Sequence, residues 1–178
     1  CEISIDYYYS EGYMPHSRTS ANVSLFNKIS RIISYSWKRK IIKNAFVNKK
    51  ITMLDVGGGD GALALYLKDK LSLINVYEKN SNCISHITQN NIFSSDNLED
   101  FKDSNYNIIT LFHSLEHVHN IEDLFYHINR VSEKDAKMII AVPNINASEI
   151  KFLTNKWVAW DVPRHLYHFS PKTLAALL

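Results

Sequence analysis

The chain has 178 residues, 46% of them hydrophobic and 21% charged, with a formal net charge of +2. This length suits one globular domain with its own core, and the small net charge argues against a nucleic-acid or membrane-surface partner. Cys1 and Cys83 are too few and too far apart for a disulfide framework. No apolar run approaches the ~20 residues of a membrane span, so we expect a cytoplasmic protein.

Residues 1–46 are expected to form an amino-terminal arm rich in tyrosine, followed by an amphipathic helix, and together to act as a lid. Ser20 or Asn22 is a candidate N-cap for that helix. The basic stretch Lys38–Lys50 is expected to be a solvated helix face. Apolar residues recur at steps of three and four and predict one apolar face: Leu25, Ile29, Ile32, Ile33, Trp37, Ile41 and Ile42.

Residues 47–143 alternate between apolar strand-like runs and helix-like runs, and they form the predicted core. Strands are expected at 51–56, 71–78, about 92–93, 106–112 and 136–144, and helices at 62–70, 80–90 and 121–133. Strands that are apolar throughout and separated by helices predict an α/β fold with a doubly wound, mostly parallel sheet covered on both faces. Residues 144–178 are irregular and aromatic until Ser170 and Pro171, which are expected to begin a last helix.

The stretch LDVGGGDG, residues 54–61, contains four of the five glycines in the chain. It follows the first predicted strand and opens a helix, which is where open α/β sheets bind ligands. Two patterns fit: a dinucleotide fingerprint through Gly57, Gly59 and Ala62, and an acidic-x-G-x-G-x-G pattern that begins at Asp55. Glu78 ends the second strand and suits ribose hydroxyls in either case, so these residues leave both ligands open.

The acidic glycine pattern resembles motif I of the class I, Rossmann-like S-adenosylmethionine-dependent methyltransferases. LFHSLEHV at 111–118 is similar to a motif of the group that includes ubiquinone-type O-methyltransferases, and WVAWDVPRHLYHFSPKTL at 157–174 is similar to a segment of one bacterial subgroup. The chain departs from the pattern at Gly58, where Cys or Ala is commoner. The resemblance implies the methyltransferase fold, with its final strands expected beyond Leu178.

The same resemblance implies a site for S-adenosylmethionine. Asp55 would help hold the ammonium group, Glu78 would bind the ribose, and the glycines would surround the methionine part. Adenine would lie between Lys79 and the turn at 96–98, and Phe112 and His113 at the end of the fourth strand would line the floor below the sulfonium. The implied cofactor-binding residues are Asp55, Gly57, Gly58, Gly59, Gly61, Glu78, Lys79, Asp96, Asn97, Leu98, Phe112 and His113.

The histidines allow more than one interpretation. His113, His117 and His119 form an H-x-x-x-H-x-H pattern, but no metal site is expected there, and Glu116 and His117 are expected to shape their loop. Arg164, His165 and His168 are the candidate catalytic residues, since they fall where this fold carries its acceptor side and histidine is a suitable base near neutral pH. A purely structural role for these three residues stays open.

The sequence therefore predicts an S-adenosylmethionine-dependent methyltransferase acting on a small-molecule or sugar-derived acceptor at oxygen. An NAD(P)-dependent oxidoreductase and a non-catalytic cofactor-binding or scaffold fragment are the alternatives. The predicted division is residues 1–46 as a cap, 47–143 as the cofactor-binding core and 144–178 as the acceptor-side segment.

Overall fold

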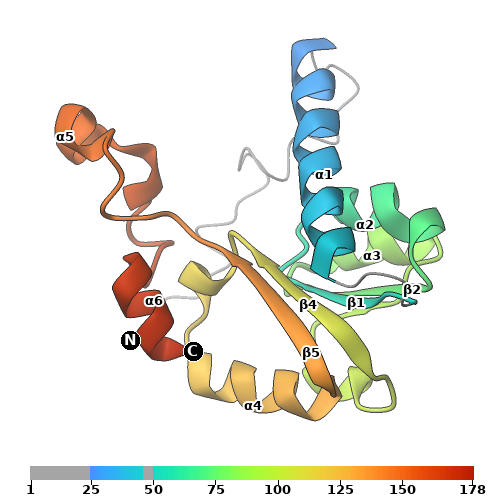
Figure 1. Cartoon of the computed structure of the whole chain (residues 1–178). Helices are drawn as coiled ribbons and strands as arrows, with labels where there is room; N and C mark the ends of the chain where they lie inside the picture. Colours follow the sequence, from blue (N-terminus) through green and yellow to red (C-terminus); the bar gives the residue numbers. More distant parts are fainter. Residues whose placement is uncertain (1–24, 46–49) are drawn as a thin grey trace.

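The computed structural model describes residues 25–45 and 50–178, and its centre is a parallel sheet with the strand order β3-β2-β1-β4-β5 (Figure 1). The strands are β1 (Thr52–Val56), β2 (Leu73–Tyr77), β3 (Ser94–Ser95), β4 (Tyr106–Phe112) and β5 (Ser132–Ala141). The helices are α1 (Leu25–Ala45), α2 (Ala62–Leu67), α3 (Ser81–Gln89), α4 (Ile121–Val131), α5 (Ile150–Leu153) and α6 (Pro171–Leu177). The order turns back at β1, as in the doubly wound sheets that the alternating pattern predicts.

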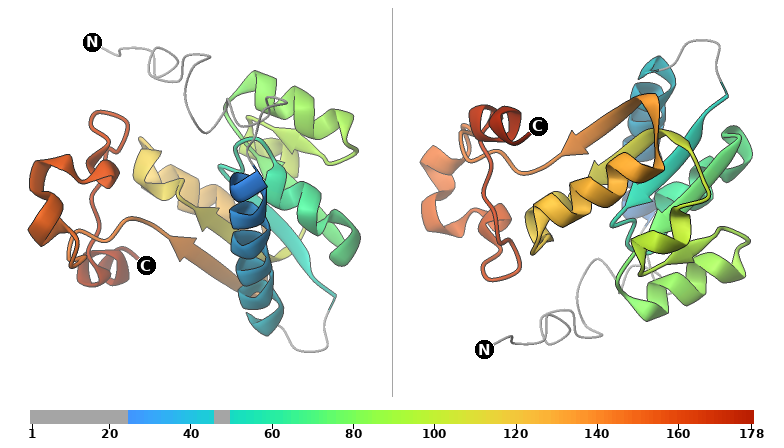
Figure 2. Two further views of the ribbon diagram at one scale, coloured as in Figure 1. Left: turned by 90° about the horizontal axis from the view of Figure 1, so that it is seen from above. Right: turned by 90° about the horizontal axis from the view of Figure 1, so that it is seen from below.

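Helices cover the sheet on both faces, as Figures 1 and 2 show. The end of α1 and the helices α2 and α3 pack on one face, where Ile42, Leu67 and Ile87 join the buried cluster beneath them. Helix α4 packs on the other face through Leu124 and Ile128. The predicted α/β fold with a parallel, doubly wound sheet is confirmed.

Most predicted elements are present, with shifts at their ends. The weak strand expected at 92–93 is the two-residue strand β3, two positions further along. The helix expected to reach residue 133 ends at Val131, because Ser132 already pairs with Tyr106 as the first residue of β5. Ser170 caps α6 as expected: its hydroxyl accepts a hydrogen bond from Thr173 N, and Pro171 follows in the first turn.

The apolar face predicted for α1 is wrong as a buried stripe. Ile33 and Trp37 are 65% and 57% exposed, and Ile32 is exposed as well, whereas Ile42 in the last turns is fully buried. The solvated face expected for the basic stretch is wrong at Lys38, which is half-buried. The helix meets the described core mainly through its carboxyl-terminal half and a polar side. The candidate caps Ser20 and Asn22 and the predicted tyrosine-rich arm lie outside the described residues.

Strand β5 is less buried than its apolar sequence predicts. It forms one edge of the described sheet, and Met138 on it is 38% exposed. An edge strand pairs on one side, so its apolar residues are covered less completely than those of β1 and β4. None of the described helices is both long enough and apolar enough to cross a membrane.

Candidate functional site

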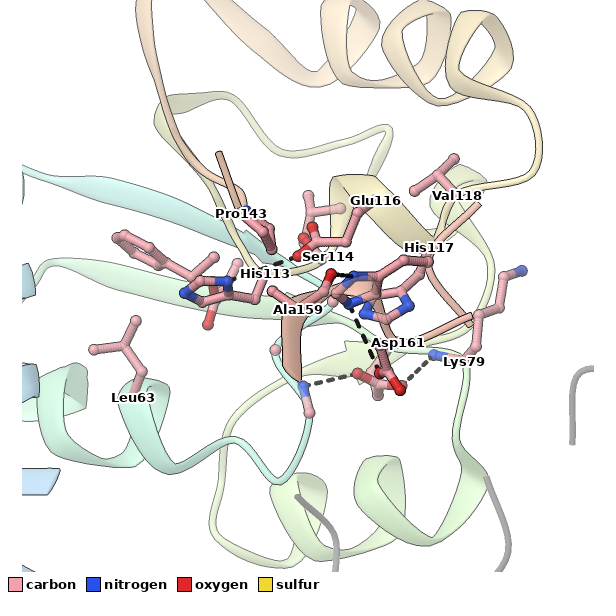
Figure 3. Close-up of a pocket in the computed structure, with 18 of the residues that line it drawn as sticks. Leu63, Lys79, His113, Ser114, Glu116, His117, Val118, Pro143, Ala159 and Asp161 are labelled. Carbon is pink, nitrogen blue, oxygen red and sulfur yellow. Dashed lines mark hydrogen bonds and ion pairs between the residues drawn. The ribbon is translucent and has the colours of Figure 1, made fainter. Parts of the chain in front are cut away.

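A cavity of about 1330 Å³ opens at the carboxyl ends of β1, β2 and β4 (Figure 3). The glycine loop forms one wall, α1 a second, and the turn after β4 together with residues 157–165 a third. Ligands in open parallel sheets bind at this edge, where the strand order reverses. The volume exceeds the ~300–1,000 Å³ of ordinary small-molecule pockets, so it leaves room for two ligands.

Two glycines of the loop differ in their surroundings: Gly59 faces the cavity, and Gly61 packs against Ile87. Gly59 has φ +57°, and a Cβ placed on it would meet no atom within 4 Å, so its backbone faces the open cavity. Gly61, at φ +70°, lies outside the lining of the cavity, and a Cβ there would come within 2.4 Å of Ile87 Cγ1. Gly61 therefore allows α2 and α3 to pack closely, while its place around the ligand stays a prediction.

Glu78 lies at the end of β2 and lines the cavity, but it also holds the glycine loop. Its Oε2 accepts a hydrogen bond from Gly59 N at 2.7 Å. Its Oε1 accepts from Lys79 N at 2.8 Å and Asn80 N at 3.0 Å. A carboxylate has about four acceptor sites, so Oε2 can accept a further bond from a ligand.

Asp55 is buried at the end of β1, and its edge reaches the cavity. Its Oδ1 accepts a hydrogen bond from the Thr110 hydroxyl at 2.6 Å. Burial raises the pKa of Asp55 to about 6, in spite of the Thr110 bond and the positive charge of Lys38. Burial also lowers the pKa of Lys38, whose ammonium lies 4.3 Å from the centre of the Phe112 ring.

Helix α1 contributes a polar side that the sequence analysis missed. Arg31 pairs with Asp60 of the glycine loop at 3.2 Å and donates a hydrogen bond to the Tyr35 hydroxyl. Arg31, Tyr35 and Lys38 all line the cavity. Their spacing of four and then three residues places them on one helix face, and that spacing is the signal in the sequence that could have identified them.

The predicted cofactor residues fall into two groups. Lys79, Leu98, Phe112 and His113 line the cavity together with Asp55, Gly57, Gly58, Gly59 and Glu78. Asp96 and Asn97 are not among the described residues that line the cavity, and the Asn97 side chain accepts a hydrogen bond from Glu99 N. Their contact with adenine stays a prediction.

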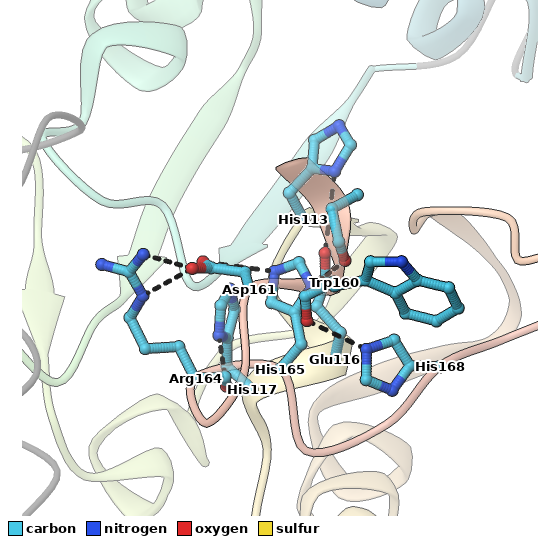
Figure 4. A network of polar contacts seen from close by, with 9 residues as sticks. His113, Glu116, His117, Trp160, Asp161, Arg164, His165 and His168 are labelled. Atoms are coloured by element: carbon cyan, nitrogen blue, oxygen red, sulfur yellow. Dashed lines mark hydrogen bonds and ion pairs between the residues drawn. The ribbon is translucent and has the colours of Figure 1, made fainter. Parts of the chain in front are cut away.

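The three candidate catalytic residues, shown in Figure 4, differ in whether they line the cavity. His165 lines the cavity while its Nδ1 bonds to Ala159 O at 2.8 Å. Arg164 pairs with Asp161, and His168 Nε2 bonds to Trp160 O at 3.0 Å. Neither is among the described residues that line the cavity, so a direct contact of Arg164 or His168 with an acceptor stays a prediction.

The turn after β4 is joined to the acceptor-side segment by its backbone. The carbonyl of Glu116 accepts hydrogen bonds from Leu166 N at 2.8 Å and Tyr167 N at 3.3 Å. His117 Nδ1 bonds to Arg164 O at 2.9 Å, and burial lowers the pKa of His117. His113 and His119 line the cavity from either side of this turn.

Comparison with known proteins identifies the family. A model of the methyltransferase domain matches residues 29–178. The chain belongs to this methyltransferase-domain family. The matched part includes α1 from residue 29 onward, the glycine loop and the acceptor-side segment, so all residues that line the cavity lie within the domain. No curated protein sequence matches the chain.

Solved structures, two of them of named methyltransferases, share the fold at low sequence identity. YcgJ of Bacillus subtilis is 17% identical with a TM-score of 0.63, over 82% of this chain and 66% of that one. The magnesium protoporphyrin IX methyltransferase ChlM from Synechocystis, bound to SAH, is 14% identical with a TM-score of 0.66, over 97% and 84%. Coclaurine N-methyltransferase, bound to N-methylheliamine and SAH, is 18% identical with a TM-score of 0.52, over 68% and 38%. This chain thus spans about two thirds of YcgJ and less of coclaurine N-methyltransferase.

Proposed function

We propose that the chain is a cytoplasmic S-adenosylmethionine-dependent methyltransferase that acts on a small-molecule or sugar-derived acceptor at oxygen. The observation that carries the proposal is one cavity lined by Gly59, Glu78 and Asp55 on one side and by His165 on the other. Membership of the methyltransferase-domain family supports the reaction class.

The residues present fit the cofactor. Gly59 gives a ligand access to the backbone, since a Cβ there would meet no atom within 4 Å. Glu78 Oε2 keeps acceptor capacity for a ribose hydroxyl beyond its bond to Gly59 N. Asp55 presents a carboxylate at the cavity edge that can pair with the ammonium of the methionine part. S-adenosylmethionine, when bound, supplies a methyl group on a sulfonium, which is a good leaving group.

In this proposal the acceptor binds against the wall formed by the turn after β4 and residues 157–165, which we call the acceptor wall. Alignment and exclusion of water supply most of the acceleration of an in-line displacement. A hydroxyl acceptor also needs a base, and His165 is the candidate catalytic residue that reaches the cavity. Its Nδ1 bonds to a carbonyl, so in the neutral ring Nε2 carries the lone pair that can take a proton.

The proposal that the acceptor atom is oxygen depends on His165 as the base alone. Coclaurine N-methyltransferase and the porphyrin enzyme ChlM share the fold, so the fold itself selects no acceptor. The cavity volume of about 1330 Å³ agrees with a small acceptor beside the cofactor.

The test is thermal unfolding of the chain with SAH, S-adenosylmethionine, NAD and NADP, each added separately. Ligand at ~100-fold its Kd stabilises the folded state by ~2.7 kcal/mol. We expect stabilisation by SAH and S-adenosylmethionine and no response to the nicotinamide dinucleotides. A response to the nicotinamides alone would replace the proposal with an oxidoreductase, and no response to any of the four would indicate a scaffold.

A further inference from the structure

Three side chains from two distant motifs meet beside the cavity (Figure 4). A carboxylate oxygen of Glu116 and one ring nitrogen each of His117 and His165 all lie within 4.8 Å of one another. All three residues line the cavity. The backbone bonds from residues 166 and 167 to Glu116 O hold the two motifs together, so this cluster is part of the fold and not a chance surface contact.

Glu116 is the unusual member of the cluster. Its side chain is buried, and neither carboxylate oxygen has a hydrogen-bond partner within the described residues. The His113 Nδ1 atom lies 3.7 Å from Glu116 Oε1, too far for a hydrogen bond. A buried carboxylate without a partner is costly, and a bound cation would remove that cost.

Each of the two imidazoles makes a hydrogen bond of the kind that metal-binding histidines commonly make. His117 Nδ1 bonds to Arg164 O and His165 Nδ1 bonds to Ala159 O. Carbonyl oxygens only accept, so Nδ1 carries the proton and Nε2 carries the lone pair in each neutral ring. Histidines that bind metals commonly donate their other ring N–H to a backbone carbonyl, which fixes the tautomer and the ring.

We propose that Glu116, His117 and His165 bind a divalent first-row transition metal ion, with Zn²⁺ as the probe. Two imidazoles and one carboxylate form a donor set that suits zinc, iron or nickel better than magnesium or calcium. Three protein ligands leave a coordination position open toward the cavity. The Asp161 carboxylate, 3.8 Å from His165 Nε2, is the next acidic group around the cluster. The proposal concerns metal binding alone and does not depend on the proposed methyl transfer. A metal ion on His165 Nε2 would use the lone pair that a general base needs, so His165 cannot serve as metal ligand and base at the same time.

The test uses the chain without a polyhistidine tag, treated with a chelator and then titrated with ZnCl₂ by calorimetry. We expect one Zn²⁺ per chain and no comparable heat from MgCl₂. Glu116→Gln, His117→Gln and His165→Gln should each weaken Zn²⁺ binding by more than about tenfold, since even outer partners of metal ligands cost 10–100-fold. His127→Gln is the matched control, because His127 lies 3.2 Å from Glu99 and 3.6 Å from Asp123 and also joins a histidine to two carboxylates.

Folding of each variant is checked by its unfolding transition. Glu116→Gln keeps the size of the side chain and removes its charge, so this variant should fold at least as well as the parent. Cobalt replacing zinc gives a visible absorption spectrum that reports nitrogen and oxygen ligands and should disappear in the folded Glu116→Gln variant. The proposal is overturned by a parent chain that binds no Zn²⁺, by a preference for Mg²⁺, or by a loss in His127→Gln equal to that in the three ligand variants.

Discussion

Replacing Asp55 by Asn should make the ligand-free protein more stable at neutral pH. The folded-state pKa of Asp55 is raised by burial from 3.8 to about 6. Between those two values the folded state binds more protons than the unfolded state, so the contribution of Asp55 to stability falls as the pH rises. A shift of this size corresponds to about 3 kcal/mol at pH 7.5, at 1.36 kcal/mol for each pKa unit, and to well under 1 kcal/mol at pH 4. The amide oxygen of Asn can still accept the Thr110 hydroxyl.

The assay is urea unfolding of the parent and of Asp55→Asn at pH 4, 6 and 7.5, with SAH binding measured at pH 7.5. We expect a gap of about 3 kcal/mol at pH 7.5 that closes at pH 4. SAH should bind the variant more weakly by roughly 1.5–3 kcal/mol, the range for a hydrogen bond to a charged group. Parallel stability curves, or a variant less stable than the parent at pH 7.5, would refute the assignment of a buried, costly charge. Thr110→Val is a second variant, and it should raise the pKa of Asp55 further.

Three more outcomes follow from the same cavity. Glu78→Ala should weaken SAH binding by roughly 1.5–3 kcal/mol in calorimetry. It should also lower the melting temperature without ligand, because three backbone N–H groups lose their acceptor. Unchanged SAH affinity would remove Glu78 from the site. Gly59→Val should abolish SAH binding in a protein that still shows a cooperative melt. Gly61→Val should mainly lower the melting temperature through its clash with Ile87. Identical behaviour of the two variants would contradict the assignment of Gly59 to ligand access and Gly61 to helix packing. His165→Gln should lower turnover by roughly 10²–10⁴ with SAH affinity retained, and unchanged turnover would assign His165 a structural role.

The central sheet was predictable because its signals are local. Strand β4 covers the same residues that its apolar run predicts, and Ser170 and Pro171 mark the start of α6 as capping chemistry requires. The glycine loop was also predictable, since a Gly cluster after a strand has few other uses. What each glycine does was not predictable, because Gly61 is defined by Ile87, which lies far along the chain.

The errors arise where tertiary packing decides. An amphipathic pattern on α1 predicts a buried apolar stripe, yet Ile33 and Trp37 are exposed and Lys38 lies against Phe112. The periodicity reports which residues share a helix face, but it does not report which face meets the core. In the same way, arginine and histidine at positions 164 and 168 suit an acceptor site. The sequence does not show that Arg164 pairs with Asp161 or that His168 bonds to Trp160 O.

The two motifs after β4 and β5 are best understood as one structural unit. Glu116 O accepts hydrogen bonds from the backbone N–H groups of residues 166 and 167, and His117 bonds to the carbonyl of Arg164, so each motif is held by hydrogen bonds to the other. The acceptor-side segment has little regular secondary structure, so these hydrogen bonds are what hold it in place. Hydrogen bonds to backbone carbonyls replace a helix or strand ladder there. The same bonds aim His165 at the cavity and bring it to Glu116, so the chemistry available at the acceptor wall is set by the joint between the motifs.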